Sequence, residues 1–503
     1  MSSLTTLQDS RSSETSSLES AVQTSQPISG GLWTPTKLPT VSENELRMMT
    51  GMTYRSIADA ILSKFDFWIT PKQLSQVIAD AYGKQWHHAG ITPVEHIADN
   101  LYSLHLGYWP TFAFKNVALE FLPRLLSLLA KDKVINVLGA SSGDTINAAH
   151  SGVNGTNIRS VFMLPATWPS AVQRLQAVNG IVNNPNALTL LADAPFDPLQ
   201  DVVKRINGRE FAEFKAEYNI TSFNSINIAR ILAQVVYYFR AYAQLNLKYQ
   251  LPLGDEVIFS VPSGNFGDAL AGYYAREMGL PIKKIVVATN ENDMLHKFFQ
   301  TGRYEPPKKD GRDYVEVTNT PSMDIAKSSN FERMLFDMVD GDADRVKGWY
   351  DDLTKNWYFQ VDPETLSRIQ EVFTSTTSTN AERESAIKDF GQDFNHWIDP
   401  HTAAAVVPWI KNRNSQPWEG LHLTNDDTPV IFLETSHVAQ FGEELKSKWI
   451  VVPWMQEFDE TLNAMRSAKP IEGEHYIRTG NSFDTIIPDI KRVLDEILPA
   501  RFQ

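Results

Sequence analysis

One lysine and two glycine-rich turns carry the residue types most suited to chemistry. Lys115 follows the apolar run Pro110-Thr-Phe-Ala-Phe, and the turns GASSGDT (139–145) and PSGNFGD (262–268) come later in the chain. A lysine amine can form a Schiff base, and backbone N–H groups at the start of a helix can hold an anion. Together these features are what pyridoxal phosphate chemistry requires.

Each feature also has a simpler interpretation. Most lysines are exposed, a glycine-rich turn often only joins a strand to a helix, and Ser and Asp favour helix N-caps. The neighbours of Lys115 favour the functional interpretation, because Phe112 to Phe114 precede it and Val117 to Leu119 follow it. This pattern predicts an amine at the start of a buried helix, where desolvation favours the neutral nucleophile.

Composition limits the class of protein. The 503 residues are 42% hydrophobic and 11% aromatic, which is enough for two or three packed domains. The net charge of -14, with no basic cluster, argues against a nucleic-acid partner. The absence of cysteine excludes disulfides, thiolate metal sites and cysteine nucleophiles. No apolar run of about 18 residues and no signal-like N-terminus occur, so we expect no membrane partner and a cytoplasmic location.

Apolar strand-like runs alternate with helical segments over most of the chain. The β-branched runs lie at 134–140, 160–166, 256–263, 284–290 and 429–436. Strands that are apolar on both faces and separated by helices predict parallel sheets covered by helices on both sides. The predicted fold class is therefore α/β.

Shifts in composition suggest domain boundaries. Residues 1–28 are rich in Ser, Thr, Gln and Glu, and we expect a disordered tail there. An N-terminal helical segment is expected at 29–100, and the lysine segment with a small α/β domain at 101–250. A large cofactor-binding α/β domain is expected at 251–330, a charged helical insertion at 331–400, and the remainder of the large domain at 401–503.

Several sequence blocks, in order, resemble threonine synthases of the long type found in fungi and some bacteria. The blocks include GASSGDTINAAHSGVNG, FNSINIARILAQVVYYF, VPSGNFGDALAGYYAREMGLPI, PSMDIAKSSNFERMLF and ETSHVAQF. The resemblance implies fold type II of the pyridoxal phosphate enzymes, as in tryptophan synthase β, with a large and a small domain. It also implies a lyase of amino-acid biosynthesis that expels phosphate from O-phospho-L-homoserine and adds water to give L-threonine.

The resemblance assigns roles to residues of this chain. It makes Lys115 the Schiff-base lysine, and Thr435 the partner of the pyridine nitrogen. Asp144 would lie near the ring hydroxyl of pyridoxal 5'-phosphate. The cofactor phosphate would bind at Gly264, Asn265, Phe266 and Gly267. The substrate carboxylate would bind at Ser141, Ser142 and Thr145, and the substrate phosphate at Asn224, Ser225 and Arg230. No metal ligand is assigned. His401 and His437 follow strands, where a structural role is more frequent than proton transfer.

Some positions depart from the family pattern. Tyr108 and Trp109 stand where His-Gly is usual, and Asn116 replaces an acidic residue. The segment 166–170 lacks a basic residue, and Gln440 replaces a lysine. We expect no counterpart of the family's early Ser-x-Arg-Gly strand before Gly30. An alternative is therefore a diverged paralogue that uses the same vinylglycine-type intermediate to release a 2-oxo acid or to add another nucleophile. A non-catalytic binding protein is a third hypothesis. We expect a small amino-acid phosphate as the partner, and a monomer or homodimer.

Overall fold

The computed structural model describes residues 5–108, 110–141, 143–166, 170–194, 196–413, 428–448, 450, 452 and 456–501. The chain forms two compact units. The large unit comprises residues Met1–Pro71, His88–Gly107 and Ile228–His437. The small unit comprises Lys72–His87, Tyr108–Asn227 and Val438–Gln503.

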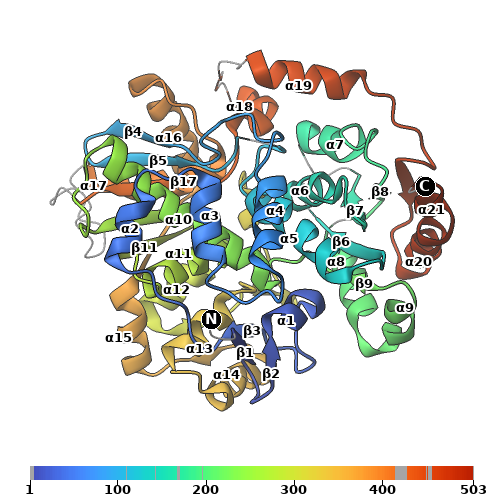
Figure 1. Ribbon diagram of the computed structural model, residues 1–503, viewed down its shortest axis with the longest axis horizontal. Coiled ribbons are helices and arrows are strands. Elements are labelled where there is room, and N and C mark those ends of the chain that lie inside the picture. The colour runs from blue at the N-terminus through green and yellow to red at the C-terminus, as the bar shows by residue number, and fades with distance from the viewer. Residues whose placement is uncertain are drawn as a thin grey trace. The chain divides into compact units, whose positions relative to one another are not determined.

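A six-stranded sheet forms the centre of the large unit (Figure 1). Its strands, in spatial order, are β16 (Phe373–Thr377), β11 (Ile282–Thr289), β10 (Val257–Pro262), β17 (Val430–Glu434), β5 (Leu101–His105) and β4 (Val94–Ala98). The first five are mutually parallel, and only β4 pairs antiparallel. Every residue of β10 and β17 is buried, as expected for central strands of a sheet with both faces covered.

The sheet of the small unit has five strands, all of them parallel. Their spatial order is β18 (Tyr476–Thr479), β8 (Ala187–Ala192), β7 (Ile158–Pro165), β6 (Ile135–Ala140) and β9 (Ile220–Thr221). Parallel strands need crossover connections, and helices supply them. Both sheets confirm the predicted α/β class, including the five apolar runs that the sequence placed in strands.

Helices surround each sheet. The large unit contains α1 (Leu18–Thr24), α2 (Glu43–Met49), α3 (Tyr54–Leu62), α10 (Ile228–Lys248), α11 (Gly267–Glu277), α12 (Met294–Thr301), α13 (Phe331–Met338), α14 (Ala343–Asn356), α15 (Pro363–Val372), α16 (Asn380–Asp393) and α17 (Pro400–Arg413). The remaining helices are α4 (Pro71–Ala81), α5 (Lys115–Ala130), α6 (Asp144–Val153), α7 (Ala171–Val178), α8 (Phe196–Asn207), α9 (Ala212–Glu217), α18 (Gly442–Ser447), α19 (Gln456–Ser467), α20 (Phe483–Arg492) and α21 (Leu498–Arg501). Over the described residues, none of these helices combines the length and apolar character needed to cross a membrane.

The expected disordered tail is ordered from residue 5 onward. The strands β1 (Thr6–Asp9), β2 (Thr15–Ser17) and β3 (Trp33–Pro35) form a small antiparallel sheet. Arg11 makes a bidentate ion pair with Glu332 of α13, at 2.7 and 2.6 Å. Leu7 and Leu18 are fully buried. A few apolar anchors and satisfied polar side chains therefore offset the ordering entropy, which the average composition of the segment did not reveal.

The two units also divide the chain differently from the expected domains. Helix α10 belongs to the large unit, and residues 438–503 belong to the small unit. The charged segment 331–400 is not a separate subdomain, because its strand β16 pairs with β11 of the large sheet. Strand pairing joins segments that are distant in sequence, so composition alone could not set these boundaries.

Candidate functional site

Lys115 is the first residue of α5, as its apolar neighbours predicted. Its Nζ lies 2.7 Å from Oδ2 of Asp144, the first residue of α6, and both side chains are largely buried. The other carboxylate oxygen of Asp144 accepts a hydrogen bond from Nε2 of Gln173 at 2.7 Å. The start of α6 also favours a negative charge at Asp144. The structure thus brings together two predicted site residues, and adds Gln173, which the sequence did not indicate.

A strained turn leads into α5. Phe112 has a φ of 62°, a left-handed conformation that is rare for a bulky residue. Its ring packs against Phe458, with 4.6 Å between ring centroids, in a buried cluster that also contains Val172, Ala439 and Leu462. Tyr108, one of the departures from the family pattern, packs against the same cluster. Packing of this kind holds a backbone conformation that would otherwise be sparsely populated.

Asn116 and Gln440, two further departures from the family pattern, both form hydrogen bonds with Thr111. Oδ1 of Asn116 accepts hydrogen bonds from the backbone N–H and the hydroxyl of Thr111, at 3.0 and 2.7 Å. Nε2 of Gln440 donates to the carbonyl of Thr111 at 2.8 Å. Asn116 and Gln440 therefore have a structural role in holding the segment before Lys115. In the departing segment 166–170, Ser170 caps α7, while Trp109 and residues 167–169 lie outside the described residues.

The turn between β6 and α6 is closed by Ser141. Its Oγ accepts hydrogen bonds from the backbone N–H groups of Gly143 and Ile146, at 3.1 and 3.2 Å. Ser141 thus satisfies one backbone donor in the first turn of α6. The N-cap residue is Gly143, however, so the Ser or Asp N-cap of the simpler interpretation is not found at this helix. Thr145 is half-buried in the first turn of α6, and Ser142 lies outside the described residues. A ligand role for these residues stays a prediction.

The turn after β10 leaves donors available for an anion. The carbonyl of Gly264 accepts a hydrogen bond from Ser328, and that of Asn265 accepts two from Asn330. Within the part of the chain that the structure describes, the backbone N–H groups of Gly264, Asn265 and Phe266 have no protein acceptor. The hydroxyl of Ser263 is likewise buried without a partner among the described residues. Donors without acceptors ahead of a helix N-terminus make a ready anion site.

The backbone of this turn is held in place by its surroundings. Phe266 has a φ of 62°, and its ring contacts those of Phe299, Phe331 and Phe373, with centroid distances of 5.2 to 6.3 Å. A Cβ on Gly264 would lie 3.1 Å from Cα of Met323, so only glycine fits there without a backbone shift.

Two tyrosines hold the carboxyl group that follows the turn. Oδ1 of Asp268 accepts hydrogen bonds from the hydroxyls of Tyr237 and Tyr238 on α10, at 2.5 and 2.8 Å. Burial raises the pKa of Asp268 to about 6, although these hydrogen bonds act in the opposite direction. Asp268 was not among the predicted site residues. Its hydrogen bonds with the two tyrosines attach α11 to α10.

The remaining predicted residues lie on different elements of the chain. Thr435 is buried directly after β17, and Arg230 is buried in the first turn of α10. Burial lowers the pKa of Arg230 to about 10. Asn224 and Ser225 lie in the small unit, in the loop after β9, where Asn224 is exposed and Ser225 half-buried.

The contacts of His401 are those of a structural residue, the role that the sequence analysis favoured over proton transfer. Its Nδ1 lies 2.9 Å from Oδ1 of Asp399, and its Nε2 accepts a hydrogen bond from the backbone N–H of Ser322 at 3.2 Å. The carbonyl of Ser322 lies beside Gly264. His401 therefore orders the loop that packs against the turn 263–266, here called the candidate anion-binding turn. Burial lowers the pKa of His437 to about 4, which keeps that imidazole neutral near pH 7.

The chain has a lysine that begins a helix, a turn with available backbone donors after a parallel strand, and two α/β units that are each built on a mainly parallel sheet. Its structural neighbours show that the fold is type II of the pyridoxal phosphate enzymes. The structure matches the crystal structure of threonine synthase from Brucella melitensis, which holds pyridoxal phosphate, with a TM-score of 0.86, 30% identity, and coverage of 98% of this chain and 100% of that one. The match to yeast threonine synthase has a TM-score of 0.85 and 31% identity over 99% of both chains.

Sequence comparison gives the family. Residues 8–82 match the family model "Threonine synthase N terminus". The threonine synthase of Methylobacillus glycogenes is 37% identical over 429 residues, which cover 83% of this chain and 86% of the relative. The chain belongs to the threonine synthase family. The family match begins at residue 8, within the segment that the sequence analysis expected to be a tail.

Proposed function

We propose that this protein converts O-phospho-L-homoserine to L-threonine with pyridoxal 5'-phosphate as its cofactor. The reaction eliminates phosphate from the γ carbon and then adds water at the β carbon. The observation that carries the proposal is the pairing of Lys115 with Asp144 at the start of two helices, in a chain of the threonine synthase family. A lysine amine held by a buried carboxylate is positioned for covalent attachment and for proton transfer.

The described residues fit the cofactor. The N–H groups of Gly264, Asn265 and Phe266 and the hydroxyl of Ser263 would hold its phosphate, and Lys115 would supply the amine for its covalent attachment. The hydroxyl of Thr435 is assigned to the pyridine nitrogen. When bound, the cofactor supplies an electron sink for the α carbon of the substrate.

Lys115 is the residue assigned to move protons. The carboxylate of Asp144 fixes the position of the amine, and Gln173 fixes the carboxylate in turn. A positioned amine can take a proton from the α carbon and return it elsewhere on the substrate, since acid and base roles need only hydrogen-bond reach. Water is the final nucleophile in this proposal.

The substrate phosphate is assigned to Arg230, Asn224 and Ser225. Arginine can pair two phosphate oxygens at once, which suits a doubly charged group in an acidic protein. Ser141, Ser142 and Thr145 are assigned to the substrate carboxylate.

The direct experiment incubates the pyridoxal-loaded protein with O-phospho-L-homoserine. Inorganic phosphate is followed with time, and the carbon product is identified by mass spectrometry. Phosphate with stoichiometric threonine supports the proposal. Phosphate with 2-oxobutanoate in place of threonine would show the diverged paralogue, and no phosphate release would mean that the substrate is different.

Lys115→Ala tests the role of the lysine in the same assay. We expect loss of turnover and of the visible absorption of lysine-bound cofactor. The exposed Lys133→Ala, in the same unit, is the matched control and should behave like the wild type. Borohydride reduction that still labels a lysine in Lys115→Ala would contradict the assignment.

Arg230→Ala tests the phosphate site. Because a charged hydrogen bond contributes about 1.5–3 kcal/mol, we expect KM for O-phospho-L-homoserine to rise about ten- to a hundredfold. The affinity for the cofactor should change much less. Arg47, exposed on α2, provides the control Arg47→Ala. Equal losses of substrate and cofactor affinity would place Arg230 at a different site.

A further inference from the structure

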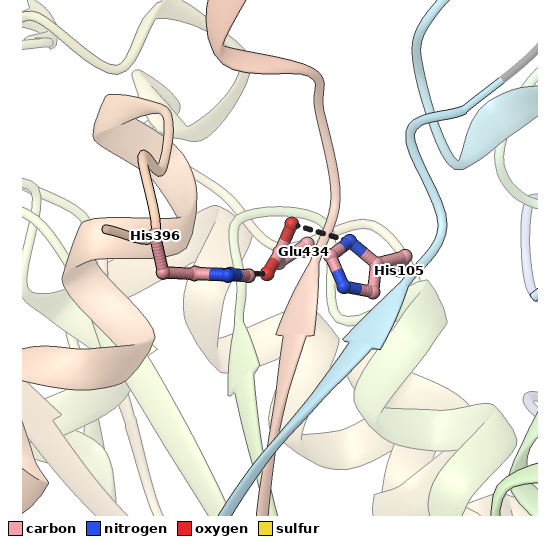
Figure 2. A group of neighbouring side chains, drawn as sticks. All are labelled: His105, His396 and Glu434. Carbon is pink, nitrogen blue, oxygen red and sulfur yellow. Dashed lines mark hydrogen bonds and ion pairs between the residues drawn. The ribbon is translucent and has the colours of Figure 1, made fainter. Parts of the chain in front are cut away.

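A group of two histidines and one glutamate lies at the carboxyl ends of two inner strands of the large sheet, and none of the three is assigned to the reaction. His105 is the last residue of β5, and Glu434 is the last residue of β17. The two strands are parallel neighbours, and these residues are register partners, so their side chains project from the same face. His396, from the segment between α16 and α17, completes the group (Figure 2).

The possible ligand atoms of the three side chains converge. Nδ1 of His105 lies 2.9 Å from Oε2 of Glu434, and Nε2 of His396 lies 2.5 Å from Oε1 of the same carboxylate. Figure 2 shows the carboxylate of Glu434 between the two imidazoles. One nitrogen or oxygen from each residue lies within 4.8 Å of the others. To admit a zinc ion, the two contacting pairs of atoms, at 2.9 and 2.5 Å, would have to move apart to roughly 3.4 Å. That is the separation that zinc–ligand distances of about 2.0–2.2 Å impose in a tetrahedron.

Outer partners orient the same side chains. Nε2 of His105, the nitrogen facing away from Glu434, lies 3.1 Å from Oε2 of Glu95 on β4. The hydroxyl of Ser103 donates a hydrogen bond to Oε1 of Glu434. A carboxylate on the second nitrogen of a histidine, and a hydrogen bond on the ligating carboxylate, are the arrangement that surrounds metal-bound residues in proteins.

We propose that His105, His396 and Glu434 bind one divalent cation of the zinc class, with a fourth position left for water. Two imidazoles and a single carboxylate suit Zn²⁺, whereas Ca²⁺ and Mg²⁺ prefer ligand sets made of oxygen. The cation would tie the ends of β5 and β17 to the segment that holds His396. Since Thr435 follows Glu434 directly, the cation would also restrain the residue assigned to the pyridine nitrogen. The site contains none of the residues assigned to the reaction.

The test uses the full-length protein without a histidine tag, treated with EDTA and then freed of the chelator. Isothermal titration with ZnCl₂ and elemental analysis after gel filtration should give one Zn²⁺ per chain. Titration with CoCl₂ should give the ligand-field absorption of a tetrahedral cobalt site. His396→Gln should remove both signals. The control His296→Gln, whose imidazole contacts Ser375 on another strand, should bind like the wild type.

Two results would overturn the proposal. One is an absence of stoichiometric zinc in the wild type, which would leave the group as a network of ion pairs. The other is equal zinc affinity in His396→Gln and the wild type. Circular dichroism in EDTA checks that His396→Gln is folded. If it is not, Glu95→Ala serves instead, and its zinc affinity should fall about ten- to a hundredfold. Unchanged affinity in Glu95→Ala would count against the site.

Discussion

At the scale of single residues, the backbone of Thr111 explains two departures from the family pattern. Asn116 accepts two hydrogen bonds from Thr111, and Gln440 donates one to its carbonyl. A buried backbone group without a partner costs about 1–3 kcal/mol, so both side chains contribute to holding the turn before Lys115. Both residues contact Thr111 in this way, so neither departure by itself indicates a different reaction.

The ion pair of Lys115 with Asp144 leads to a prediction at the same scale. Asp144→Asn keeps the shape of the side chain but removes the charge that holds the amine. Because a hydrogen bond to a charged group contributes about 1.5–3 kcal/mol, we expect kcat to fall about ten- to a hundredfold. Phosphate release measures the effect, and cofactor absorption shows whether the cofactor is still bound. The exposed Asp132→Asn should leave kcat unchanged. A kcat within twofold of wild type in Asp144→Asn would remove Asp144 from the mechanism.

At the scale of elements, the helices α5 and α11 each follow a turn in which a phenylalanine has a left-handed backbone conformation. Phe112 lies three residues before α5, and Phe266 directly precedes α11. Each such residue costs roughly 1–3 kcal/mol, and aromatic packing on both rings offsets that cost. Buried aromatic contacts therefore fix where α5 begins, at Lys115, and where α11 begins, after the turn 263–266.

Gly264→Ala tests how closely the candidate anion-binding turn is confined. The added Cβ would lie 3.1 Å from Cα of Met323 and 3.2 Å from the carbonyl oxygen of Ser322, which are backbone atoms that cannot rotate away. We expect the turn to shift, and the affinity for pyridoxal phosphate to fall about tenfold, which corresponds to about 1.4 kcal/mol. Equilibrium titration of the cofactor-free protein measures the affinity. Gly348→Ala, where a Cβ meets no atom within 4 Å, is the control. Wild-type affinity in Gly264→Ala would show that the turn does not hold the cofactor phosphate.

At the scale of the whole molecule, a buried histidine should make the protein sensitive to acid. His150 on α6 lies between Ser160 and Thr189, with its ring nitrogens 2.9 and 3.1 Å from their hydroxyl oxygens. Burial, with a smaller contribution from Arg501, lowers its pKa to about 3. The unfolded chain has a histidine pKa of about 6.5 and so binds a proton that the folded chain does not. Below pH 6.5 this group reduces the free energy of unfolding by about 1.4 kcal/mol per pH unit.

His150→Gln removes this titration. Between pH 6.5 and pH 5, the variant should lose about 2 kcal/mol less unfolding free energy than the wild type. Urea unfolding at each pH measures the difference, and the exposed His87→Gln should follow the wild type. Identical pH dependence of wild type and His150→Gln would show that His150 is not neutral in the folded protein.

The sequence by itself determined the features whose cause is local. The start of α5 at Lys115, the turn after β10 and the five apolar strands follow from neighbouring residues, and the ordered blocks were enough to indicate the family. Residue roles in binding the substrate and cofactor rest on the family pattern, and they stay proposals.

Only the tertiary structure decided which distant residues meet. Gln440 contacts Thr111 across 329 residues, and Ser103 contacts Glu434 across 331. The parallel strands β5 and β17 bring Ser103 and Glu434 together through their order and register in the sheet, which the local pattern of neither strand determines. Gln440 and Thr111 lie outside the strands, and packing within the small unit brings them together. The same reason explains the N-terminal segment. Its polar composition predicted disorder, but Glu332 on α13 supplies the partner that orders Arg11.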